Sequence, residues 1–117
     1  FELRTPLSYI CTKVRQGDDI NSIQIINKEG VGALVLEKQD NGETCQTWIY
    51  EYKDSLYEVY VKKGTSFKLE DGLSIIPSNG LKFSLKGNLL TITAEDHREI
   101  TRSLSLSFRT AQGGESL

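Results

Sequence analysis

The chain has one side chain suited to acid–base chemistry near neutral pH. His97 is its only histidine, and an imidazole can act as a general base there. It lies in the charged segment Glu95–Glu99, and no sequence motif ties a nucleophile to it. A second imidazole that could share a metal ion with it does not exist in the chain. We interpret His97 as a solvated loop residue and expect no catalytic and no metal site.

Carboxylate pairs are the other candidates, because calcium binds where several oxygen ligands converge. No segment matches the calcium-loop pattern, and nearly every acidic pair coincides with a predicted turn. Asp and Asn favour turns because their side chains bond their own backbone. Turn formation therefore explains these clusters best: Asp18-Asp19, Asp40–Glu43, Glu70-Asp71 and Glu95-Asp96.

No cofactor and no nucleic acid is indicated. Gly30-Val31-Gly32 lacks the further glycine and the following helix that dinucleotide binding requires. The formal net charge of −2 argues against nucleic-acid binding, which usually needs a basic patch.

The two cysteines, Cys11 and Cys45, allow two interpretations. They could form a disulfide if the segment that carries Cys11 packs on the strand that carries Cys45. Alternatively, they are two small buried thiols, which is the usual state of a free cysteine. There is no Cys-x-x-Cys, so neither a redox nor a zinc motif is present.

A helix must position the first of these cysteines. Apolar residues recur at helical spacing through Leu3–Gln16, and Gly17 is a natural stop. The stripe consists of Leu3, Leu7, Ile10, Cys11 and Val14.

The start of this helix has two interpretations. Thr5 could cap it with Pro6 at the first helical position. Alternatively, a longer helix arrives from upstream and kinks at Pro6, which the apolar Leu3 keeps open. Because the chain starts at Phe1 and contains no Met, we expect that its beginning, with an anchor, is missing.

From Ser22 onward apolar residues alternate, which predicts strands. Asp40-Asn41-Gly42 and Gly87-Asn88 are hairpin signals, and the last strand places Ser103 and Ser105 outward. We predict an α+β domain over residues 1–110, with the helix packed across a meandering antiparallel sheet of about seven strands, and a flexible tail over residues 111–117.

The most aromatic part is one hairpin whose register is open. A three-residue loop, Lys53–Ser55, pairs Trp48 with Tyr60. A two-residue loop, Asp54-Ser55, pairs Trp48 with Val61. A slip of one residue exchanges the two faces of a strand.

The second register is favoured because it separates the faces. It puts Glu51 and Glu58 on one face, although opposite one another, which is unfavourable. The other face then carries Trp48, Tyr50, Tyr52, Tyr57, Val59 and Val61. We interpret this aromatic face as core, with a ligand-stacking surface as the alternative.

The layout resembles the soluble domain of a minor pilin or pseudopilin of type II secretion systems and Gram-positive competence pili. Glu2–Ile10 is placed like the second half of the pilin helix. Trp48–Glu58 is similar to a pattern in which a Tyr-containing strand and a turn precede Leu-Tyr-Arg, with Glu58 in place of Arg. Leu81–Phe83 and Leu89–Thr93 are also placed like the late strands of such proteins.

The resemblance implies a non-enzymatic structural subunit at the cell surface, without a cofactor. Its partners would be other pilin-like subunits, and the membrane through an upstream segment. The assembly face of the helix would consist of Leu3, Leu7, Ile10 and Val14. The alternative function is a cell-surface ligand-binding β-domain that uses the aromatic hairpin.

Overall fold

The computed structural model describes residues 5–16, 20–95 and 101–107. These residues form one α-helix, one turn of 3-10 helix and eight strands. In chain order the elements are α1 (Pro6–Gln16), β1 (Ile20–Lys28), β2 (Val31–Asp40), β3 (Glu43–Tyr52), β4 (Ser55–Lys62), the 3-10 turn η1 (Leu69–Asp71), β5 (Leu73–Pro77), β6 (Lys82–Lys86), β7 (Leu89–Glu95) and β8 (Thr101–Ser107).

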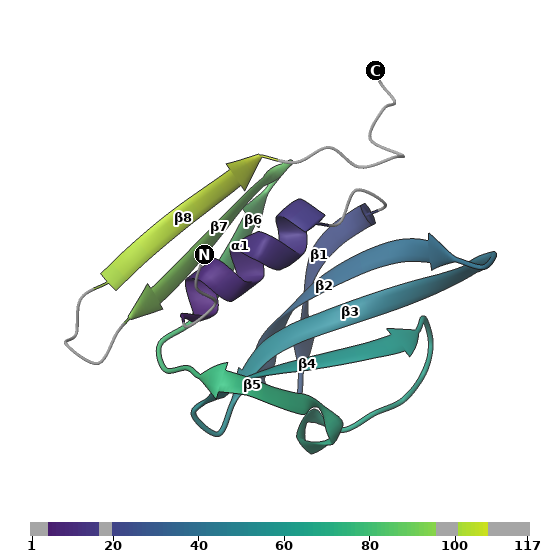
Figure 1. The fold of residues 1–117 in the computed structure, drawn as a ribbon, viewed down its shortest axis with the longest axis horizontal. Coiled ribbons are helices and arrows are strands. Elements are labelled where there is room, and N and C mark those ends of the chain that lie inside the picture. Colours follow the sequence, from purple (N-terminus) through teal and green to yellow (C-terminus); the bar gives the residue numbers. More distant parts are fainter. Residues whose placement is uncertain (1–4, 17–19, 96–100, 108–117) are drawn as a thin grey trace.

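The strands form two antiparallel sheets, with α1 between them (Figure 1). The first is a five-stranded meander, β1-β2-β3-β4-β5, and the second is β6-β7-β8. The α+β class, with the helix followed by antiparallel strands, is confirmed. The strands are divided, however, because the meander ends at β5 and the chain passes to a separate sheet against α1 and the edge of β1 and β2.

Within the described residues the helix begins after Thr5, which acts as its N-cap as in the first of the two predicted starts, while the segment that the second start requires lies in residues 1–4, outside the described residues. The Thr5 Oγ1 accepts a hydrogen bond from the backbone N–H of Ser8, at 3.1 Å. The Thr5 carbonyl accepts the first helical bond, from the N–H of Tyr9, at 3.0 Å. Pro6 needs no partner for its nitrogen at this position. Local sequence therefore fixes where α1 starts in the described chain.

The first core lies between the two sheets and is filled by the helix. Ile10 is fully buried there, together with Leu34 and Ile49 of the large sheet and Leu90 and Ile92 of the small sheet. Burial of one such aliphatic side chain contributes roughly 1.5–3 kcal/mol. Phe83 and Leu85 of β6 pack against the same cluster, so α1 and the small sheet together cover this face of the large sheet.

A second core lies on the opposite face of the five-stranded sheet. The fully buried Tyr50 is at its centre, with Val35 and Trp48 beside it. Phe67 and Leu69, from the segment that joins β4 to β5, cover it. The large sheet is thus buried on both faces.

The β3–β4 hairpin has a register that differs from both predicted ones. Trp48 pairs with Val59, so the turn consists of Lys53 and Asp54, with φ of 50° and 63°. These are the left-handed conformations of a type I′ turn. The favoured register was wrong by two residues, and an even shift leaves the aromatic face as predicted. Glu51 then lies opposite a leucine and not opposite a second carboxylate.

Some predicted features lie outside the described residues. These are Leu3, Asp18-Asp19, His97 and residues 111–117.

Candidate functional site

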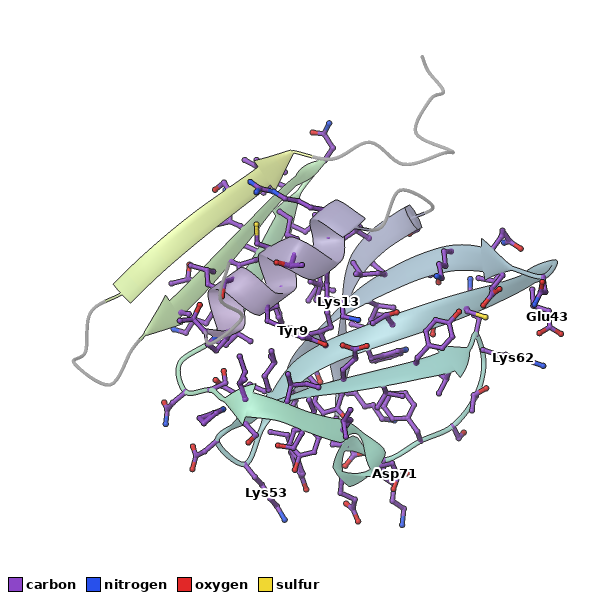
Figure 2. All side chains as sticks on the ribbon, in the orientation of Figure 1. Tyr9, Lys13, Glu43, Lys53, Lys62 and Asp71 are labelled. Carbon is purple, nitrogen blue, oxygen red and sulfur yellow. The ribbon has the colours of Figure 1, made fainter. Side chains whose placement is uncertain are left out.

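Glu58 of β4 joins the helix to the large sheet. Its carboxylate accepts a hydrogen bond from the Tyr9 hydroxyl and, at 3.0 Å, from Lys13 Nζ. Tyr9 and Lys13 are four residues apart, which places them on one face of a helix. Figure 2 shows both side chains on the side of α1 that faces the large sheet. We call these three residues the helix–sheet joint.

The joint is partly shielded from water and its protons are fixed. The side chains of Lys13 and Glu58 are 35% and 17% exposed. Burial, reinforced by the Glu58 carboxylate, raises the pKa of Tyr9 well above its usual range. Tyr9 therefore remains a hydrogen-bond donor at neutral pH. Because each Glu58 oxygen already has a donor, this arrangement favours positioning over proton transfer.

Glu51 of β3 holds the connection between the two sheets. Its carboxylate accepts a hydrogen bond from the Ser78 hydroxyl at 2.6 Å. It also accepts hydrogen bonds from the backbone N–H groups of Gly80 and Leu81, at 3.3 Å each. Close by, the Asp54 carbonyl accepts a hydrogen bond from the backbone N–H of Ser78 at 3.1 Å. One carboxylate thus satisfies three donors of a segment that has no regular secondary structure.

A third carboxylate, Glu37 of β2, lies at the end of the aromatic face. It is 8% exposed and accepts hydrogen bonds from Gln24, at 3.1 Å, and Gln46, at 2.7 Å. Lys63 Nζ is 3.6 Å away. The Trp48 indole N–H donates to Gln46 at 3.0 Å, so this network also fixes the edge of the second core.

The aromatic side chains contact one another. Trp48 packs edge-on against Phe67, with ring centroids 5.1 Å apart, and Tyr50 stacks on Tyr57 at 5.8 Å. The Tyr50 hydroxyl donates to the Leu69 carbonyl at 2.6 Å, and burial raises the pKa of Tyr50 to about 12. These contacts favour a core role for the hairpin over a ligand-stacking surface.

The predicted assembly face contacts the protein's own core. Ile10 is fully buried, and Leu7 and Val14 pack partly buried against the same cluster. Cys11 on α1 and Cys45 on β3 are both buried and free. The structure therefore does not join them.

Sequence reasoning missed Glu51 and Glu58 as contact residues, because it identified only the aromatic face of this hairpin as core. The signal that could have found them is an apolar residue two positions before each glutamate in its strand. Ile49 precedes Glu51 by two residues and Leu56 precedes Glu58 by two, so each carboxylate shares a face with a fully buried side chain.

Two further properties bear on function. No helix among the described residues is long and apolar enough to cross a membrane. Within the same part of the chain, no group of three or more His, Cys, Asp or Glu side chains could hold a metal ion.

Fold and site together define a small α+β domain whose N-terminal helix is fixed between two antiparallel sheets. The family model of DUF4860, a domain of unknown function, matches residues 1–97, and the chain belongs to this family. No curated protein and no solved structure matches the chain.

Proposed function

We propose that the protein is a non-enzymatic, pilin-like structural subunit of a cell-surface filament or of a secretion or competence apparatus. In this proposal α1 is the assembly element through its exposed side, which carries Arg15, because Leu7, Ile10 and Val14 are packed in the domain's own core, and the two sheets form its head. A membrane segment upstream of residue 1 would hold the subunit at the cell surface. The observation that carries the proposal is the helix–sheet joint, which fixes α1 to the head through partly buried polar contacts.

The joint suits an element that transmits force or sets a subunit's orientation. Apolar packing of Ile10 supplies the adhesion of α1 but tolerates small rotations, since hydrophobic attraction has no direction. The hydrogen bonds of Glu58 with Tyr9 and Lys13 have defined geometry. They select one rotation of α1 about its axis. A subunit that assembles through its helix needs a fixed angle between helix and head.

The natural gene product tests the proposal most directly. We expect about 20 predominantly apolar residues immediately upstream of residue 1, the length that a helix needs to cross a bilayer. The native protein should then fractionate with membranes or with surface filaments. A gene product without that apolar segment would refute the proposal.

Site-specific photo-crosslinking in intact cells tests the assembly role of the helix. A photoreactive residue at the exposed Arg15 of α1 should capture neighbouring subunits. The matched control is the exposed Asn41, at the tip of the β2–β3 hairpin. Capture of pilin-like subunits from Arg15 and not from Asn41 supports the proposal. Equal capture from both positions, or none from Arg15, contradicts it.

A further inference from the structure

The outer edge of β8 is available for pairing. In Figure 1 β8 is the outermost strand of the small sheet. It pairs with β7 from Thr101 to Ser107 with no register shift. Among the described residues, no strand pairs with its second edge. Seven consecutive residues thus present a regular backbone edge.

The other outer strands carry features that prevent edge pairing. Natural proteins protect edges with bulges, lysines, prolines or short length. β1 has a register shift between Ile20 and Ser22, and β5 is only five residues long and ends at Pro77. β6 is equally short and has Lys82 and Lys86 at its two ends.

β8 has none of these features. It contains no lysine, no proline and no bulge, and Arg102 is its one charged residue. A long, regular and nearly uncharged edge is the kind that accepts another strand. β8 therefore lacks the protection that the edges of β1, β5 and β6 carry.

The outward face of β8 already forms hydroxyl pairs with its neighbour. Thr91 of β7 is hydrogen-bonded to Ser105 at 3.1 Å, and Thr93 to Ser103 at 3.2 Å. Both serines are exposed. A further strand with serines in register would extend these rows, since cross-strand hydroxyl pairs stabilise a sheet.

We propose that β8 pairs in antiparallel orientation with β8 of a second copy of this chain, about a two-fold axis at Ser105. This register places Ser105 opposite its own copy and Ser103 opposite Ser107 of the second copy. Leu104 then lies opposite Leu106 of the second copy, so serine meets serine and leucine meets leucine over residues 103–107. The result is a continuous six-stranded sheet with a closed two-fold interface.

The alternation of serine and leucine favours β8 of a second copy as the partner strand. A strand from an unrelated chain would match this pattern only by chance, whereas identical antiparallel strands match it by symmetry. The inference goes beyond the proposed function and does not rest on it, because it uses no part of α1.

A lysine at the centre of the edge tests the interface. Ser105→Lys places two ammonium groups opposite one another in the pair, and like charges directly opposite are destabilising. Ser84→Lys is the matched control, because Ser84 is exposed, faces Thr91 in the same row and lies at the opposite edge. Sedimentation velocity over a concentration series measures the dissociation constant of the dimer.

We expect the wild-type chain and Ser84→Lys to dimerise alike, and Ser105→Lys to raise the dissociation constant by about tenfold or more. Circular dichroism should show that both variants remain folded. A wild-type chain that is monomeric throughout the series overturns the proposal. Equal weakening by both lysines also overturns it, since that is a general effect of charge.

A cysteine at the same position tests the register. Directly opposite antiparallel residues have Cα atoms about 4.5–5.5 Å apart, which is within the span of a disulfide. Mild oxidation of Ser105→Cys should therefore give a covalent dimer, and Ser84→Cys should not. Failure of Ser105→Cys to crosslink, or equal crosslinking by both variants, excludes pairing about Ser105.

Discussion

The two faces of the five-stranded sheet are both buried, but by different means. The face toward α1 is covered by a regular helix and a second sheet. The opposite face is covered by the irregular segment that carries Phe67 and Leu69. The helix satisfies its own backbone hydrogen bonds, whereas the irregular segment needs partners from the sheet.

The difference decides where each face places its polar groups. On the helix face, Glu58 contacts the side chains of Tyr9 and Lys13, so this contact sets the orientation of α1, while Glu51 on the same face holds the Ser78–Leu81 segment. On the aromatic face, the Tyr50 hydroxyl contacts a backbone carbonyl, that of Leu69. Its polar contact therefore holds a loop in place. The contacts of Glu58 thus set the direction of a helix, whereas the contact of Tyr50 supports the packing of a covering segment.

Removal of Tyr50 should have the largest effect on stability. Tyr50→Ala deletes a fully buried ring and the partner of the Leu69 carbonyl, so we expect a loss of about 3–5 kcal/mol in the free energy of unfolding. Urea denaturation measures it. Tyr60→Ala is the control on the same hairpin, because Tyr60 is 48% exposed, and it should cost about 1 kcal/mol or less. Similar losses for both would show that the aromatic face is not a packed core.

A methyl group at Gly72 should disturb the same face by overpacking. A Cβ there would lie 2.9 Å from Val59 Cγ2 and would also collide with the Tyr50 hydroxyl. We expect Gly72→Ala to cost about 1–3 kcal/mol. The control, Gly32→Ala, has no atom within 4 Å of its Cβ and should be neutral or slightly stabilising. A Gly72→Ala variant as stable as Gly32→Ala would mean that the covering segment is loosely held.

Truncation of Glu58 tests the helix face, and we expect a smaller loss of stability than for Tyr50. Glu58→Ala leaves the Tyr9 hydroxyl and Lys13 without their partner, and we expect a loss of about 1–2 kcal/mol. Hydrogen exchange should rise in α1 more than in β7. Glu43→Ala breaks the exposed pair with Lys62, which are 53% and 67% exposed, and should cost less than about 1 kcal/mol. Equal losses of stability in Glu58→Ala and Glu43→Ala would show that the helix–sheet joint contributes no more than an exposed ion pair.

Local signals predicted most of the fold. The Thr5 cap, the Asp40-Asn41-Gly42 hairpin and the serine–leucine alternation of the last strand all rest on neighbours in sequence. The β3–β4 register failed because Lys53 and Asp54 adopt positive φ, a conformation more typical of Asn and Gly. The split into two sheets depends on contacts distant in sequence, which periodicity does not report.

The site was harder to predict than the fold because it depends on which face is buried. Only the aromatic face of the hairpin was interpreted as core, and Glu51 and Glu58 were assigned to the face opposite it. Since both faces are buried, these carboxylates meet the Ser78–Leu81 segment and the helix instead. Only the packing of distant elements decides whether a carboxylate in a strand contacts water or protein.

Alkaline titration compares the two faces in one experiment. Burial raises the pKa of Tyr50 to about 12 and also raises the pKa of Tyr9, whereas a tyrosine in the unfolded chain titrates at about 10. Above pH ~10 the unfolded state loses these protons first. The contribution of these two tyrosines to stability should therefore be constant below that pH and fall as the pH rises toward about 12. Tyr50→Phe removes the contribution of the aromatic face and Tyr9→Phe that of the helix face. The free energy of unfolding of each variant, measured by urea denaturation, should therefore decline less steeply with pH than that of the wild type. A decline of unchanged slope in both variants would show that neither hydroxyl is protected by the fold.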